Sequence, residues 1–134
     1  MFTHAGASAS FSAITMQKIS GIPGIPLVNI SAYRRIITDK TIAAINSGHP
    51  VVAESSLFAG DAQVTADGSQ QQITIASSHV YTVAAADENG VTLINPWGHN
   101  NRSGGAKGST GATFTMSWEE FYANYGDVTV GFIP

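Results

Sequence analysis

The sequence contains no cysteine, which excludes disulfide bonds, zinc–thiolate sites and a thiol nucleophile within this chain. Charge is also scarce: Asp, Glu, Lys and Arg make up 11% of the 134 residues, and the formal net charge is -3. Basic residues cluster only as the pair Arg34 and Arg35, so the positive patch of a nucleic-acid-binding protein is missing. Stability must therefore come from packing and hydrogen bonding, and we expect no nucleic-acid partner.

Long hydrophobic runs are absent too. No apolar run approaches the roughly 18 residues that cross a bilayer, so we expect no membrane partner. Residues 1–13 lack the basic and apolar regions of a secretion signal, and their Ala, Gly and Ser content predicts a flexible leader or boundary segment. This leaves the localisation open. The length fits one core and not two, so residues 14–134 are expected to form a single domain.

Two segments have the pattern of short helices. In the segment 38–47, Thr38 can act as N-cap and Gly48 can end the helix. In the second, Ser117 and Glu120 form a capping box, and Gly126 is expected to end the helix. The apolar face of this second helix comprises Trp118, Phe121, Tyr122 and Tyr125.

Short apolar or β-branched segments, bounded by turn residues, predict strands. These segments are 51–56, 72–76, 79–85, 91–95 and 128–133. Three other segments are expected to be irregular: a short helical turn and loop at 14–30, an excursion at 57–69, and a long exposed loop at 98–113. The predicted fold class is α+β, with a twisted antiparallel sheet and two short helices.

The chemically distinctive part is the sequence Ser-His-Val-Tyr-Thr-Val at 78–83, followed by Asn-Pro-Trp-Gly at 95–98. The two segments resemble the histidine and asparagine strands of papain-like proteases, and the Asn-Pro-Trp-Gly form is that of the calpain family. The helix-to-strand segment 45–56 and the segment 114–125 resemble the flanking parts of the same lobe. The resemblance extends over nearly the whole chain, from about Ile14 to Ile133.

This resemblance implies the half-barrel of a papain-like second lobe, with His79 and Asn95 as catalytic residues and Trp97 shielding their hydrogen bond from water. Pro96 and Gly98 would complete the supporting turn. A cysteine protease needs an imidazole that deprotonates the thiol and a third group that fixes the imidazole tautomer. The cysteine would come from a separate lobe, which becomes the expected partner beside a protein or peptide substrate. No cofactor is implied, and the chain alone is expected to be inactive.

The spacing of this pair constrains the turn between the two strands. In an antiparallel hairpin, His79 and Asn95 share a face only if the loop between the strands keeps the right parity. A tight two-residue turn at Asn89-Gly90 would put the side chains on opposite faces. The sequence therefore predicts a wider loop, at about Ala85 to Asn89.

Metal binding is not expected, although conventional calpains bind calcium in this lobe through carboxylates in and just after the loop that follows Asn-Pro-Trp-Gly. From Gly98 to Trp118 this chain has no Asp or Glu, and it has Arg102 and Lys107 instead. Five acidic residues elsewhere are predicted to be solvated turn residues: Glu54, Asp61, Asp67, Asp87 and Glu88.

Other functions remain open at this point. The chain could be a binding or scaffolding module that kept the fold and lost the chemistry, with sheet edges or the excursion at 57–69 as its contact surface. It could also belong to another papain-like branch, such as the bacteriocin-processing peptidases, although Trp97-Gly98 favours the calpain type. His49 is expected to be a helix-end residue, and His99 a solvated loop residue.

Overall fold

The computed structural model describes residues 15–18, 30–105 and 107–132. Its elements in chain order are β1 (Thr15–Lys18), α2 (Ile30–Asn46), β2 (Val51–Ser55), β3 (Asp61–Ala66), β4 (Ser69–Thr74), β5 (Val80–Asp87), β6 (Gly90–Arg102), β7 (Ser109–Met116), α3 (Trp118–Asn124) and β8 (Tyr125–Phe132). The fold is therefore α+β, as the sequence predicts.

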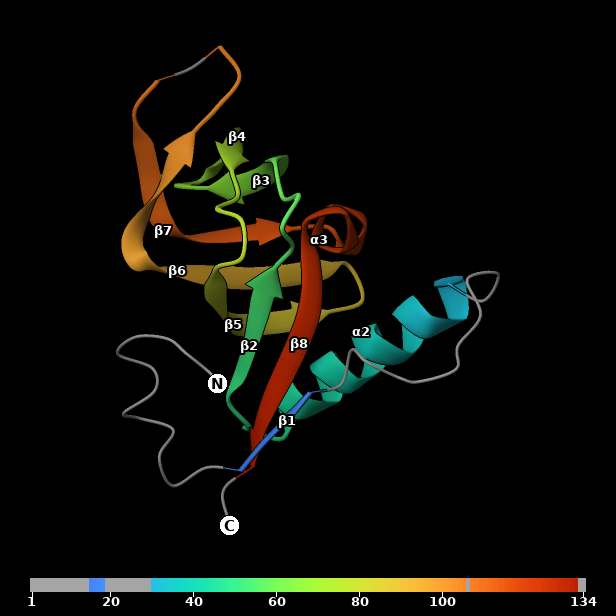
Figure 1. Cartoon of the computed structure of the whole chain (residues 1–134). Helices are drawn as coiled ribbons and strands as arrows, with labels where there is room; N and C mark the ends of the chain where they lie inside the picture. The colour runs from blue at the N-terminus through green and yellow to red at the C-terminus, as the bar shows by residue number, and fades with distance from the viewer. Residues whose placement is uncertain (1–14, 19–29, 106, 133–134) are drawn as a thin grey trace.

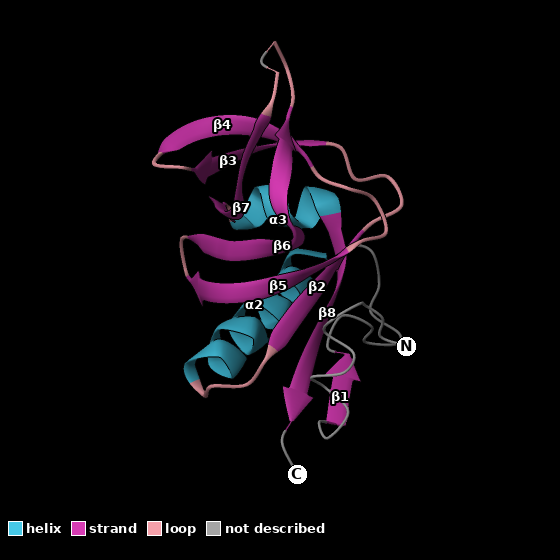
Figure 2. Ribbon diagram, turned by 90° about the vertical axis from the view of Figure 1, so that its left-hand side faces the viewer, coloured by secondary structure: helices cyan, strands magenta, loops and turns pink. Residues whose placement is uncertain are grey.

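The strands pair antiparallel in the order β1-β8-β2-β5-β6-β4-β3-β7. Strand β6 also pairs with β7, so β6, β4, β3 and β7 form a closed circuit of neighbours. Helix α2 contacts β2, β5 and β8, whereas α3 contacts β3, β6 and β8 (Figure 1 and Figure 2). The two helices thus cover different parts of the strongly twisted sheet.

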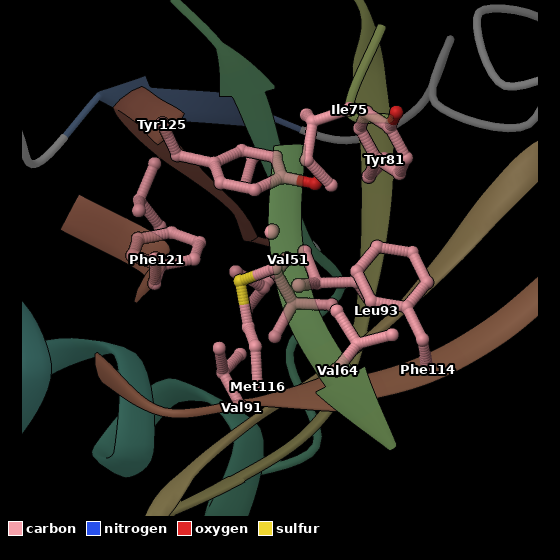
Figure 3. Packing of buried hydrophobic residues seen from close by; sticks show 14 of the residues in the cluster. Val51, Val64, Ile75, Tyr81, Val91, Leu93, Phe114, Met116, Phe121 and Tyr125 are labelled. Carbon is pink, nitrogen blue, oxygen red and sulfur yellow. The ribbon is translucent and has the colours of Figure 1, made fainter. Parts of the chain in front are cut away.

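The hydrophobic core lies where the strands and α3 converge. Strand β2 contributes three consecutive buried residues, Val51 to Ala53, because it lies between β8 and β5 and is covered by α2. Figure 3 shows the rings of Phe121 and Tyr125 on one side of this cluster and Phe114 on the other. The rings of Phe121 and Tyr125 stack with centroids 4.7 Å apart. Buried residues of β5 and β6 belong to the same core, which fixes the positions of these two strands.

Helix α2 ends as predicted but begins earlier. Gly48 has a φ of +79°, and its N–H donates to Ile45 O, while the N–H of His49 donates to Ala44 O. This is the Schellman arrangement that glycine favours. Thr38 is not the N-cap: it lies inside the helix, and its Oγ1 is 2.7 Å from Tyr122 Oη. The preceding turns are helical because buried Ile37 packs into the core.

Helix α3 starts at the predicted cap, since Ser117 accepts a hydrogen bond from the N–H of Glu120. The Glu120 carboxylate does not complete the capping box; it accepts instead from Gln63 N at 3.3 Å. The helix stops at Asn124, before Gly126, because Tyr125 already has the extended backbone of β8. Tyr125 nevertheless packs in the core as expected.

Two predicted irregular segments are wrong. The excursion at 57–69 contains β3, which pairs with β4, and the exposed loop at 98–113 contains the ends of the β6–β7 hairpin. Only residues 103–108 connect those two strands. Strand β3 alternates exposed residues with the buried Ala62, Val64 and Ala66, whereas the 98–113 segment adds no residue to the hydrophobic core and is held by backbone pairing. The helical turn expected at the start of the segment 14–30 is also wrong, because residues 15–18 form strand β1. Residues 19–29 and the predicted leader at 1–13 lie outside the described ranges.

Candidate active site

His79 lies immediately before β5, in a loop fastened to the end of β2. The N–H of His79 donates to Ser55 Oγ at 2.9 Å, and its carbonyl accepts from Ser55 N at 2.9 Å. The preceding residue, Ser78, has a φ of +48°, an uncommon conformation for a residue other than glycine. This backbone clamp positions the imidazole at the start of β5, an internal strand between β2 and β6.

Asn95 lies in an interruption of the β6–β7 ladder. The register runs from Ile94 opposite Thr113 to His99 opposite Gly111, so the four residues 95–98 face a single residue of β7. Pro96 fits this bulge because it has no N–H to contribute to a ladder, and Gly98 supplies a φ of +85°. The bulge turns Asn95 inward, where it is 2% exposed, and leaves Trp97 52% exposed.

The prediction of a wide loop between the two strands is wrong, but the reason for making it was sound. Asp87 pairs with Gly90, so the turn has two residues. Glycine is needed at the first position of β6, because a Cβ on Gly90 would collide with the carbonyl oxygen of Met116. A bulge between Val83 and Ala85 then shifts the register by one residue. This shift restores the parity that the tight turn alone would have broken.

The two side chains singled out in the sequence therefore meet. His79 Nε2 lies 3.1 Å from Asn95 Oδ1, which also accepts a hydrogen bond from Trp97 N at 3.0 Å. The second contact is an Asx turn, a local structure that the Asn-Pro-Trp sequence favours. Because Asn95 occupies Nε2, Nδ1 is the ring nitrogen left for a reacting group.

Aromatic rings surround the imidazole on two sides. The Trp97 ring lies over His79 with centroids 4.5 Å apart and planes at 36°, and the Tyr81 ring meets it edge-on at 5.0 Å. Burial raises the pKa of Tyr81, whose hydroxyl accepts a hydrogen bond from Ala76 N, so this ring stays neutral. The His79 imidazole therefore lies between two uncharged aromatic rings, those of Trp97 and Tyr81.

The hydroxyl of Ser55, although near His79 in the fold, is bound to backbone groups. It donates to the carbonyls of Ala76 and His79 and accepts from His79 N. It is therefore a structural clamp, not a nucleophile aimed at the ring. Within the described ranges, no three His, Asp or Glu side chains are grouped to hold a metal ion.

Two other histidines, His49 and His99, and one cavity among the described residues are separate from the His79–Asn95 contact. His49, just after α2, has its ring tilted against that of Phe132, with centroids 4.8 Å apart. The centroid of the exposed His99 ring lies 6.2 Å from that of Trp97. A cavity of about 480 Å³ opens at the opposite end of the β5–β6 hairpin, where Asp87 and Glu119 are among its lining residues. His79 and Asn95 do not line that cavity.

Asn100 is the site residue that sequence reasoning missed. It is buried, and its Oδ1 accepts a hydrogen bond from Asn95 Nδ2 at 3.1 Å. Its only sequence signal is its position five residues after Asn95 in a polar segment, which is too weak to separate it from its exposed neighbours His99 and Asn101.

Comparison with known proteins adds no assignment: no protein-family model matches the sequence, and no curated protein matches it significantly. Among the described residues, no helix combines the length and apolar character needed to span a membrane. Any functional conclusion therefore depends on the geometry of the site.

Proposed function

We propose that this chain is the histidine- and asparagine-bearing lobe of a calpain-like, papain-type cysteine peptidase. The observation that carries the proposal is the contact of His79 Nε2 with Asn95 Oδ1. It joins the two residues that the family resemblance assigns to catalysis, and it leaves Nδ1 available to a thiol.

In this proposal the imidazole takes the proton of a cysteine thiol and later returns it to the leaving amine. Asn95 fixes the ring orientation, and Trp97 limits access of water to the hydrogen bond between them. The closed circuit of β6, β4, β3 and β7 supports the finer proposal that the sheet is the half-barrel of a papain-like second lobe.

The nucleophile has to be supplied by a cysteine-bearing lobe, either upstream in the same protein or on a separate chain, because this chain has no cysteine. The purified chain should therefore neither hydrolyse peptides nor react with thiol-directed inhibitors. Hydrolysis by the isolated chain that depends on His79 would contradict this division of roles.

The decisive experiment measures peptide hydrolysis by the protein that combines this lobe with a cysteine-bearing lobe. His79→Ala should lower kcat/KM by about a thousandfold or more, whereas Asn95→Ala should leave measurable turnover, since base and nucleophile remain. The matched control is Asn101→Ala, at an exposed asparagine of β6. Wild-type activity in the His79 variant, or a complete protein without a cysteine, would refute the proposal.

A second function has its own supporting observation. Leu57 and Phe58 are 69% and 88% exposed on the turn after β2. That turn is fastened to the His79 loop, because Ser78 N donates to Ser56 O. Exposed apolar side chains of this kind are common at protein contacts, which favours a binding module as the alternative. Leu57→Ser with Phe58→Ser should abolish partner capture in that case and leave an active peptidase site intact.

A further inference from the structure

Asn100 is a buried polar residue in an otherwise exposed stretch of β6. It is 1% exposed, whereas its neighbours His99 and Asn101 are exposed. Burying an amide is unfavourable unless its donors and acceptor are satisfied. The partners of Asn100 therefore show what the burial achieves.

The amide nitrogen of Asn100 is held by β7 where the β6–β7 ladder is interrupted. It donates to Gly111 O at 2.7 Å and to Ala112 O at 3.1 Å. Both partners are backbone carbonyls, which can only accept. A flipped amide would place its oxygen against two oxygens, so Oδ1 of Asn100 has to face Asn95.

This orientation determines that of Asn95. Because Asn100 Oδ1 can only accept, Asn95 has to present its Nδ2, which lies 3.1 Å away. The opposite end of the Asn95 amide is then its oxygen, which also receives the N–H of Trp97. Two independent groups, the Trp97 N–H and the Asn100 oxygen, thus select the same orientation.

The orientation of the Asn95 amide in turn determines which nitrogen of His79 carries the proton. Asn95 Oδ1 has no proton, so the contact at 3.1 Å is a hydrogen bond only if His79 Nε2 carries one. Neutral His79 is then protonated on Nε2 and bare on Nδ1. Nδ1 is therefore the basic nitrogen.

We propose that Asn100 is a positioning residue: held by the carbonyls of Gly111 and Ala112, it fixes the amide of Asn95 and through it the Nε2–H tautomer of His79. The importance of this tautomer for catalysis rests on the proposed peptidase function, but the tautomer itself does not. The proposal can therefore be tested on the purified chain, without a nucleophile or a substrate.

The experiment is long-range ¹H–¹⁵N NMR of the imidazoles at a pH where they are neutral, with the His79 signals assigned from their loss in His79→Gln. The wild type should show the Nε2–H tautomer of His79 and a slowly exchanging ring proton. Asn100→Ala should lower the ratio of Nε2–H to Nδ1–H by roughly fivefold, the worth of one net hydrogen bond, and speed exchange of that proton. Asn100→Asp should restore neither signal, because the carboxylate oxygen that replaces the NH₂ group would face the carbonyls of Gly111 and Ala112.

The control for general destabilisation is Thr110→Val. Thr110 is buried opposite Asn100 and donates to Asp67 at 2.6 Å, so removing its hydroxyl weakens the attachment of the same strand, β7, to the β3–β4 turn, and neither Thr110 nor Asp67 hydrogen-bonds Asn95. Its His79 signals should match those of the wild type. An Nδ1–H tautomer in the wild type would overturn the proposal even if Asn100→Ala fails to fold. A folded Asn100→Ala with wild-type His79 signals would overturn it too, whereas absence of peptidase activity would affect only the proposed function.

Discussion

Trp97 lies over His79 while half-exposed. A buried tryptophan would cost roughly 3 kcal/mol or more on truncation. Here the ring is 52% exposed and its closest aromatic contact is His79. Its contribution to the free energy of unfolding is therefore that of an aromatic pair at the surface.

Trp97→Ala should accordingly lower the free energy of unfolding by only about 1 kcal/mol. In the protein combined with its cysteine lobe, kcat/KM should fall by roughly tenfold, equivalent to about 1.4 kcal/mol of barrier, because water reaches the hydrogen bond between His79 and Asn95. Urea unfolding and peptide hydrolysis measure the two effects separately.

The matched variants are Trp97→Phe, which keeps a ring over His79, and Phe58→Ala, which removes a more exposed ring, 88% accessible. Trp97→Phe should retain most of the activity, and Phe58→Ala should leave the catalytic rate unchanged. If Trp97→Ala keeps full activity, the ring does not shield the site.

Between elements, Asp67 fastens the β3–β4 turn to β7. Its carboxylate accepts from Thr110 Oγ1 at 2.6 Å and from Gly111 N at 3.0 Å. A Cβ on Gly111 would come within 2.8 Å of that carboxylate, so glycine makes the close approach possible. The same stretch of β7 supplies the carbonyls that hold Asn100, which links this contact to the site.

The hydrogen bond from Thr110, followed by that from Gly111, lowers the pKa of the Asp67 carboxyl in the folded protein. A depressed folded-state pKa adds stability above the unfolded-state value of about 3.9, and this stability is lost as the pH falls through the folded-state value. Asp67→Asn should therefore be less stable than the wild type at neutral pH. The difference should shrink as the pH falls below about 4.

Thermal unfolding across this pH range measures the effect, and Thr110→Val supplies the control. Without the Thr110 hydroxyl, Asp67→Asn should cost less than it does in the wild type, because the two groups act as a pair. The hydrogen bond does not stabilise the fold if Asp67→Asn lowers the stability equally with and without Thr110→Val. The same conclusion follows if the stability difference between Asp67→Asn and the wild type persists in acid.

At the scale of the whole molecule, several acidic residues hold the turns and ends of the β-hairpins. Asp87 Oδ1 accepts from Asn89 N and Gly90 N in the β5–β6 turn, and Asp61 accepts from Thr74 between β3 and β4. These carboxylates lie at the ends of different hairpins. A calcium ion needs several oxygen ligands that converge at about 2.3–2.6 Å.

We therefore expect calcium to leave the chain unchanged. Calorimetric titration should detect no saturable binding below about millimolar calcium, the range of weak extracellular sites. The thermal midpoint should be the same with calcium and with EDTA. A rise in the midpoint with calcium that EDTA reverses would disprove this and would call for a search for the ligands by substitution of Glu54, Asp61, Asp67, Asp87 and Glu88. Glu54 and Asp61 lie in strands and not in the turns expected from the sequence.

The sequence by itself determined the elements whose signals are local: the Gly48 stop of α2, the Ser117 cap of α3, the apolar run of β2 and the Asx turn at Asn-Pro-Trp. Each depends on neighbours within a few residues, so residue type is sufficient.

Only the tertiary structure decided how His79 meets Asn95. The bulge at 83–85 and the ladder of β6 with β7 arise from pairing between strands, which local patterns do not encode. Asn100 shows this most clearly: its burial depends on carbonyls eleven and twelve residues away that are available because the ladder is interrupted there. A polar residue in a polar segment gives no local sign of such partners, since burial depends on the packing of the whole sheet.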